Sequence, residues 1–291
     1  MKPLVSIITV NYRQEAITCA LLQSIRALNH PSLEVIVVDN GFVEDNTTKF
    51  QESCPSALVF NSKKNLGFAG GNNLGIRHSS GQFLFLVNND TVIGKGLIDR
   101  LLQRFDTPGT GMVSPKIRYF DAPDVIQYAG FTQVNPLTGR NACIGQGEVD
   151  RGQHDSPRKM PYAHGAAMMV SREVIDKVGV MDEGFFLYYE ELDWCEQIRR
   201  AGFDIWYEPS AMILHKESVS TGKASPLKME YLTRNRIRFM RRNFGGAKLA
   251  VFLLFFYLVS VPVNTVRLLS SGNWSNLKAF YSGAFRQGNR H

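Results

Sequence analysis

Three groups of polar residues in this sequence could carry chemistry, and each lies beside a strongly apolar segment. The first is Asn88-Asn89-Asp90, directly after the apolar run FLFLV. A carboxylate there could hold a divalent cation, because Mg²⁺ and Mn²⁺ are commonly bound by one or two carboxylates together with substrate phosphates. Asp90 could equally cap the turn that follows the strand. The residues alone leave both interpretations open.

The second group is an acidic cluster of Glu190, Glu191 and Asp193, which follows the apolar and aromatic run FFLYY. Acids in the first turn of a helix complement its dipole, which is a purely structural explanation. That explanation does not account for the apolar neighbours. A partly desolvated carboxylate has a raised pKa and is a better general base. We therefore favour a catalytic role for this cluster.

The third group is the Gly- and Asn-rich segment NLGFAGGNN at residues 65–73. Its glycines would let a ligand approach the backbone, although a turn before a helix explains the segment equally well. It matches neither the dinucleotide-binding nor the P-loop pattern. The segment therefore gives no support to hydride transfer or to NTP hydrolysis, which usually carry these motifs. His215 ends a predicted strand, where structural hydrogen bonding and metal ligation both stay open. His164 is assigned no metal.

The elements that must position these groups alternate between strand and helix patterns. This alternation is typical of an open, mostly parallel α/β sheet flanked by helices, with ligands bound at the carboxyl ends of the strands. After residue 106 the alternation weakens and Gly, Pro, Asn and Gln become frequent. Strands are predicted at residues 4–10, 33–38, 57–60, 83–87, 112–119, 125–131, 163–170, 203–207 and 211–214, and helices at 15–28, 72–78, 171–178 and 190–201.

Composition narrows the class of protein. The 291 residues are 44% apolar and 20% charged, which excludes a disordered chain and a membrane protein with many spans. Four widely spaced cysteines indicate neither a disulfide scaffold nor a Cys-rich zinc site. The start MKPLVSIITV lacks the apolar core of a signal peptide, so we expect a reduced, cytoplasmic compartment.

Positive charge is concentrated in the tail. Residues 218–291 hold twelve of the 33 Lys and Arg residues and one acid, Glu230. The uncharged run at 249–266 would span about 27 Å as a helix, close to a bilayer core of about 30 Å. We expect the tail to lie in or dip into an anionic membrane surface at the cytoplasmic face of the inner membrane. A single span, or a hairpin packed on the catalytic domain or on another subunit of a homo-oligomer, stays open.

In their order along the chain, the segments EVIVVDN, FLFLVNNDT and GFFLYYEELDWC resemble glycosyltransferase family 2, the inverting enzymes of GT-A fold. The likeness is greatest to the bacterial rhamnosyltransferase-like branch and covers roughly residues 5–244. It implies a catalytic domain at 1–226, with a nucleotide-binding half at 1–106 and an acceptor-side half at 107–226. Residues 227–291 would be the helical, membrane-associating extension.

The resemblance implies transfer of one sugar, with inversion, from a nucleotide-diphosphate sugar to a hydroxyl. The donor would be dTDP-rhamnose or a UDP-hexose, and the acceptor a lipid-linked or saccharide molecule in surface polysaccharide synthesis. The cofactor would be Mg²⁺ or Mn²⁺. Nucleic acid is not an expected partner, because the body of the chain is mildly acidic and the basic tail carries no recognised binding motif.

The resemblance also assigns residues to roles. The nucleotide-sugar site would include Thr9, Asn11, Tyr12, Asp39, Asn65, Asn72, Asn88 and Asn89. Asp90 would contact the metal with His215 as a further ligand, and Glu191 would be the general base, with Asp193 as its rival and Glu190 on the acceptor side. Two positions depart from the family: Asn88 replaces the first acid of the D-x-D motif, and Glu191 stands where Asp is usual.

Two alternatives follow from the same residues. A processive polysaccharide synthase is less favoured, because such enzymes usually need several membrane helices and the chain offers one apolar stretch. A catalytically inactive nucleotide-sugar-binding scaffold would explain the depleted Asn-Asn-Asp motif. The intact acidic cluster at 190–193 argues against that second alternative.

Overall fold

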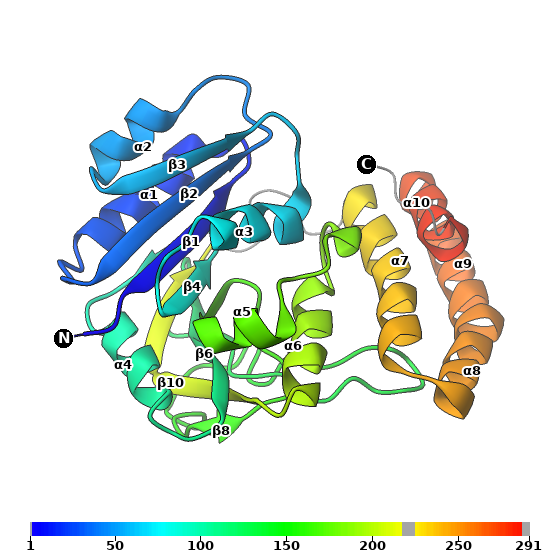
Figure 1. The fold of residues 1–291 in the computed structure, drawn as a ribbon. Coiled ribbons are helices and arrows are strands. Elements are labelled where there is room, and N and C mark those ends of the chain that lie inside the picture. The colour runs from blue at the N-terminus through cyan, green and yellow to red at the C-terminus, as the bar shows by residue number, and fades with distance from the viewer. Residues whose placement is uncertain (1, 217–224, 287–291) are drawn as a thin grey trace.

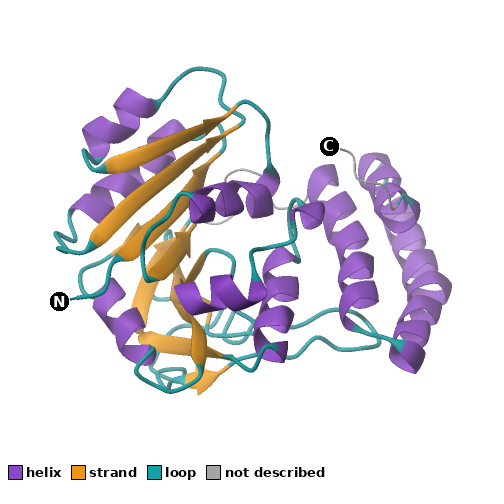
Figure 2. Cartoon of the chain, viewed as in Figure 1, coloured by secondary structure: helices purple, strands orange, loops and turns teal. Residues whose placement is uncertain are grey.

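The computed structural model describes residues 2–216 and 225–286, which form one sheet flanked by helices and a helical extension beside it (Figure 1). Figure 2 shows the strands gathered in a single twisted layer, with the helices that follow residue 225 grouped on one side of it. The expected α/β architecture with a C-terminal helical extension is confirmed.

Ten strands form the sheet, in the order β3-β2-β1-β4-β9-β6-β10-β5, with β7 paired to β6 and β8 to β10. The strands are β1 (Val5–Asn11), β2 (Leu33–Asn40), β3 (Ala57–Ser62), β4 (Phe83–Val87), β5 (Thr91–Ile93), β6 (Thr110–Tyr119), β7 (Ile126–Tyr128), β8 (Arg158–Lys159), β9 (Ala167–Ser171) and β10 (Asp204–His215).

The sheet is mixed rather than mostly parallel. Strands β1 to β4 are parallel to one another, as the sequence predicts. Strand β9, however, runs antiparallel between β4 and β6, and β5 runs antiparallel to β10. Parallel neighbours need a crossover connection, usually a helix, and the strand–helix alternation that supported the prediction weakens after residue 106.

Helices cover both faces of the sheet, because successive strand residues point to opposite sides. Ile7 packs in the core under α1, α2 and α4, and Ile8 in the core under α3, α5 and α6. The helices are α1 (Glu15–Arg26), α2 (Thr47–Ser53), α3 (Gly67–Arg77), α4 (Leu97–Arg104), α5 (Arg172–Val178), the 3₁₀ turn η1 (Glu183–Phe185), α6 (Glu190–Arg200), α7 (Pro226–Asn243), α8 (Gly246–Phe255), the π turn η2 (Phe256–Ser260), α9 (Val261–Ser270) and α10 (Trp274–Phe285).

Two elements differ from the sequence prediction in a way that affects the site. Helix α3 begins at Gly67 rather than at residue 72, so most of the Gly/Asn-rich segment is helical. The strands predicted at 203–207 and 211–214 are one strand, β10, whose register against β6 shifts between Glu208 and Met212. Pro209 lies in this irregularity, where its missing N–H removes one ladder bond. The strand nevertheless continues and ends at His215.

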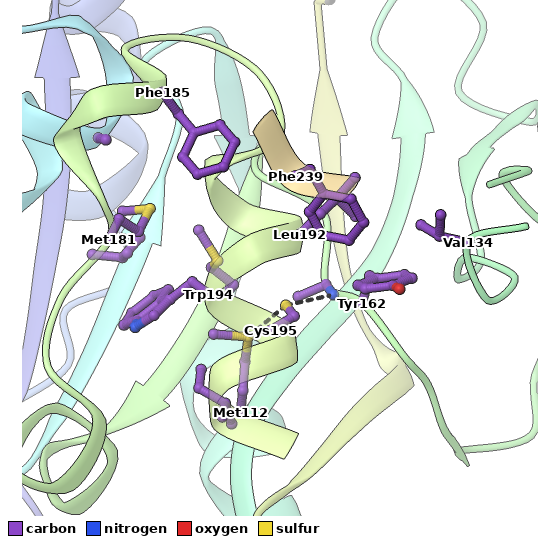
Figure 3. Close-up of a cluster of buried hydrophobic side chains, with 14 of the residues drawn as sticks. Met112, Val134, Tyr162, Met181, Phe185, Leu192, Trp194, Cys195 and Phe239 are labelled. Carbon is purple, nitrogen blue, oxygen red and sulfur yellow. Dashed lines mark hydrogen bonds between the residues drawn. The ribbon is translucent and has the colours of Figure 1, made fainter. Parts of the chain in front are cut away.

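Helix α6 is held by its buried face. Figure 3 shows Leu192, Trp194 and Cys195 among the side chains of the core, near Met112 and Phe239. The indole N–H of Trp194, which is fully buried, donates to the carbonyl oxygen of Gly179 at 3.0 Å. This packing fixes the first turn of α6, which carries the acidic cluster.

The C-terminal extension contains, among the described residues, one helical segment long and apolar enough to span a bilayer. It covers Gly246–Ser270, has a mean hydropathy of 2.1 in its most apolar window, and has 17% of that window buried. Phe252 and Phe256 pack into the core shared with the catalytic domain. On the opposite side Leu254 and Leu258 are 60% and 70% exposed.

Candidate functional site

A cleft of about 390 Å³ opens at the carboxyl ends of β1, β2 and β4 and at the end of β10. It brings together residues that lie far apart in the sequence but share one edge of the sheet. The predicted site residues that line it are Tyr12, Asn65, Asn88, Asn89, Asp90, Glu190, Glu191 and His215.

Asp39 and Asn11 do not line this cleft; they support it from behind. Asn11 donates from Nδ2 to Asp39 Oδ1 at 2.8 Å, and Asn46 donates to Asp39 Oδ2 at 3.0 Å. Asp39 is 1% exposed, and both of its oxygens are engaged. The Asn11–Asp39 pair joins the ends of β1 and β2, and its predicted contact with a nucleotide stays a prediction.

Thr9 and Asn72 are likewise outside the cleft lining. Thr9 is fully buried within β1, between its neighbours in the sheet. Asn72 is 3% exposed and donates to the carbonyl oxygen of Phe68, one turn earlier in α3. Asn72 therefore lies within α3 rather than at the start of a helix, and its side chain is engaged by the backbone of the same helix.

Asp90 and His215 form the part of the cleft that could hold a cation. Asp90 Oδ1 lies 3.0 Å from His215 Nε2, and both side chains are buried. Apart from this contact with each other, neither of the two atoms has a hydrogen-bonding partner among the described residues. A buried carboxylate oxygen and an imidazole nitrogen without other hydrogen-bonding partners are suitable ligands for one shared divalent cation.

Gln127 orients His215. The two side chains meet at 2.9 Å between Gln127 Oε1 and His215 Nδ1. With a proton on Nδ1 the lone pair of Nε2 is available, the usual arrangement for a metal-binding histidine. Among the described residues no group of three or more His, Cys, Asp or Glu side chains could hold a metal ion. The chain thus offers two ligands, which suits a cation that substrate oxygens and water complete.

His164 also lines the cleft, although the sequence indicated no role for it. Its ring centroid lies 6.2 Å from that of His215. Burial and the nearby His215 lower the pKa of His164 to about 3, so the ring is neutral near pH 7. Its Nδ1 accepts a hydrogen bond from the backbone N–H of Ala166 at 3.0 Å. Gln127 and His164 carry no motif that sequence reasoning could have used.

The loop before α6 aims the acidic cluster into the cleft. Phe186, Tyr188 and Tyr189 have φ of 65°, 69° and 74°, values that non-glycine residues rarely adopt. Such residues cost roughly 1–3 kcal/mol each and persist only where surrounding contacts hold them. A Cβ at Gly67 would collide with the carbonyl oxygen of Phe186, so the glycine lets the start of α3 pack against this loop.

Asn235 of α7 holds the loop in place. The side chain is fully buried, and its amide nitrogen, which carries two hydrogens, lies within hydrogen-bonding distance of three carbonyl oxygens of the loop. These acceptors are the carbonyl oxygens of Phe185, Leu187 and Tyr188, at 2.8, 2.7 and 2.9 Å. The segment YLTRNRIRF, which the sequence analysis placed in the extension, therefore supports the catalytic domain directly.

Glu190 and Glu191 are desolvated neighbours. Glu190 is 3% exposed, and one carboxylate oxygen of each residue is buried without a hydrogen-bonding partner in the described chain. Burial and the charge of Glu191 raise the pKa of Glu190 well above its usual value. Burial raises the pKa of Glu191 to about 7. A carboxylate with this pKa is well matched to proton transfer near neutral pH.

Asp193 does not line the cleft, so the structure gives no support to its predicted place as a rival base. It lies one helical turn from the cluster but faces α7. Its Oδ1 accepts from Arg242 Nε at 3.1 Å and from Asn243 Nδ2 at 2.7 Å. The carboxylate is committed to joining α6 to α7, whereas Glu191 stays in the cleft wall.

Comparison with known proteins identifies the family to which the chain belongs. Residues 6–179 match the family model "Glycosyl transferase family 2", more than half of the chain, so the chain belongs to this family. It is a glycosyltransferase by family, and the resemblance seen in the sequence is confirmed.

The chain is also similar to two named glycosyltransferases and to a solved structure. "Low-salt glycan biosynthesis hexosyltransferase Agl10" of Haloferax volcanii is 28% identical over 244 residues, covering 82% of this chain and 75% of that protein. "N-acetylglucosaminyl-diphospho-decaprenol L-rhamnosyltransferase" of Mycobacterium tuberculosis is 25% identical, covering 77% and 79%. The mannosyltransferase PcManGT of Pyrobaculum calidifontis, solved with GDP-Man and Mn²⁺, superimposes with a TM-score of 0.62 at 14% identity, covering 99% and 87%. This last likeness supports the GT-A fold.

Glu190 should make stability depend on pH. Its pKa is higher in the folded chain than the ordinary value of 4.5, so its stabilising contribution is present at low pH and is lost as the pH rises through the folded-state pKa. We expect the melting temperature to fall as the pH rises above the ordinary pKa of 4.5, and Glu190→Gln to reduce that fall. At higher pH the variant should gain roughly 2–4 °C per kcal/mol of repulsion removed.

The control is Glu52→Gln on the exposed surface of α2, which should follow the wild type at every pH. Thermal unfolding monitored by circular dichroism measures all three proteins. A wild type and a Glu190→Gln variant with parallel melting curves across this range would contradict the assignment.

Proposed function

We propose that this chain is an inverting, metal-dependent glycosyltransferase that moves one sugar from a nucleotide-diphosphate sugar to an acceptor hydroxyl. The donor that we propose is dTDP-rhamnose, with UDP-hexoses as the alternative, and the acceptor is a lipid-linked or saccharide intermediate of a surface glycan. The family and the two relatives above support the transfer reaction, since one relative is a hexosyltransferase and the other a rhamnosyltransferase.

The observation that carries the proposal is the position of Glu191. This residue and Tyr188 line both the cleft that contains Asp90 and His215 and a second cavity of about 410 Å³ beside α7. A base that serves a single displacement must face the acceptor on one side and the sugar on the other. Glu191 is the acidic residue that lines both spaces in the described chain.

In the mechanism that we propose, the acceptor hydroxyl attacks the anomeric carbon from the face opposite the departing nucleotide diphosphate. Glu191 takes the hydroxyl proton as the new C–O bond forms, and its pKa near 7 suits this transfer. Tyr12, Asn65, Asn88 and Asn89 would contact the nucleotide sugar. Asp90 and His215 would hold Mg²⁺ or Mn²⁺, which when bound neutralises charge on the leaving diphosphate.

The extension would attach the enzyme to an anionic membrane surface on its cytoplasmic face. One side of Gly246–Ser270 packs on the catalytic domain, and the other exposes a row of apolar side chains. This arrangement supports a helix that lies in the interface better than one that spans the bilayer alone. Membrane attachment would keep the active site beside a lipid-linked acceptor.

Glu191→Gln should lower kcat by about 10²–10⁴-fold and leave donor binding unchanged, because the amide cannot accept the proton. In the wild type, kcat should fall as the pH drops below about 7, where Glu191 becomes protonated. Nucleotide release measures turnover and calorimetry measures donor affinity. The matched variant Asp193→Asn should keep most of the activity and lower the melting temperature, because it weakens the contact with Arg242. The opposite pattern would make Asp193 the base.

Asp90→Ala should weaken Mn²⁺ binding in the presence of a nucleoside diphosphate by tenfold or more, a change of about 1.4 kcal/mol. The change removes one of the two side chains that would hold the cation. Electron paramagnetic resonance of free Mn²⁺ gives the affinity. Asp176→Ala, an exposed carboxylate on α5, is the control and should bind as the wild type does. Equal Mn²⁺ affinity in both variants would refute this metal site.

Liposome flotation tests the membrane proposal. The protein should float with vesicles that contain phosphatidylglycerol at low salt, and the double variant Leu254→Gln, Leu258→Gln should float less because its apolar face is interrupted. The control Val43→Gln alters a side chain that is 78% exposed but far from the extension, and should not change flotation. Wild-type protein that stays at the bottom of the gradient would rule out attachment.

A further inference from the structure

The second cavity, beside the donor cleft, carries an unusual charge arrangement. It lies between the 131–141 segment, the start of α6 and the helices of the extension. Three arginines from distant parts of the chain line it: Arg140, Arg236 and Arg267. Apolar side chains such as Met229, Leu232 and Phe280 form much of the remaining wall.

Arg236 is the most informative of the three. Its side chain is 4% exposed, and its Nε makes no hydrogen bond to any described residue. The guanidinium lies over the ring of Phe256, 4.9 Å from the centroid, a weak substitute for an anion. Burial and the nearby Arg140 lower the pKa of Arg236 to about 10. Both effects make the positive charge of Arg236 unfavourable where it lies.

Two other arginines of α7 are paired with carboxylates. Arg238 contacts Asp182 at 2.9 Å, and Arg242 contacts Asp193 at 3.1 Å. Within residues 2–216 and 225–286, by contrast, Arg140, Arg236 and Arg267 form no ion pair with a carboxylate. A buried cation without an anion is unfavourable, so a ligand that supplies anionic oxygens would relieve the cost.

The fold brings the segment that carries Arg140 close to Arg236. Gly139 has φ of +64°, and a Cβ there would meet Phe252 at 2.9 Å and Arg236 at 3.0 Å. The hydroxyl of Tyr189 donates to the carbonyl oxygen of Gly139 at 2.9 Å. The segment that carries Arg140 is therefore pinned between the loop before α6 and the extension.

We propose that this cavity binds the diphosphate group of a lipid-linked acceptor, with Arg140, Arg236 and Arg267 contacting its oxygens and the lipid chain following the exposed apolar side of Gly246–Ser270. The inference rests on the proposed function, because it places the acceptor on the side of Glu191 opposite Asp90. Guanidinium groups suit phosphate oxygens, which they contact through paired N–H donors. The apolar wall suits the first carbons of the lipid.

Binding of farnesyl diphosphate tests the site, and farnesol, which has the same hydrocarbon chain without the diphosphate, is the uncharged control. Calorimetry in a non-ionic detergent should show that the wild type binds farnesyl diphosphate and binds farnesol far more weakly. Arg140→Gln and Arg267→Gln should each weaken farnesyl diphosphate binding by roughly 10- to 100-fold. Both side chains are exposed, so the fold should tolerate these changes. Arg151→Gln, at an exposed arginine outside both cavities, is the control.

Each outcome decides the question. Equal affinity in the wild type and both variants would overturn the inference. So would a loss of binding to phosphatidylglycerol vesicles in the variants with no loss for farnesyl diphosphate, because the arginines would then serve lipid headgroups. Donor affinity and Glu191-dependent turnover, measured on the same proteins, report on the proposed function separately. Arginine-dependent diphosphate binding by a chain without transferase activity would support the site and refute the function.

Discussion

Two adjacent carboxylates kept away from water at the first turn of α6 are the constraint on which the site depends. Their desolvation is unfavourable, and the loop that leads to them has a strained backbone at Tyr188 and Tyr189. Packing elsewhere offsets both costs: Trp194 is buried in the core beneath α6, and Asn235 binds three carbonyl oxygens of the loop. Stability is thereby used to hold a carboxylate with a raised pKa at the cleft.

The first turn of α6 separates a candidate cation site from a cluster of arginines. Asp90 and His215, on one side, are a carboxylate and an imidazole that could share a cation. Arg140 and Arg236, on the other, lie close enough for their charges to interact unfavourably. Glu191 lines both spaces. This separation would keep a metal-bound leaving group and an anionic acceptor apart while their reacting atoms meet at one carboxylate.

The extension is part of the catalytic unit rather than an appendage. Residues such as Phe252 share the main core, and Asn235 shapes the loop before α6. The basic composition of the tail favoured membrane contact, and a hairpin packed on the catalytic domain was the alternative. In the structure, Asn235 and Arg236 face inward, and Arg242 holds Asp193 away from the cleft. A charge count along the chain cannot show which arginines turn inward, because a helix places neighbours on different faces.

The sequence by itself determined the strands of the first half and the ligand edge of the sheet, because local periodicity and chain order carry that information. Its resemblance to a known family singled out Asp90, Glu191 and His215 as candidates. Only the tertiary structure decided which polar residues reach the cleft. Asp39 and Asp193 have the right residue type and neighbourhood, yet their oxygens are engaged by Asn46 and by Arg242. Such partners come from other segments, so their effect exists only once the chain has brought those segments into contact.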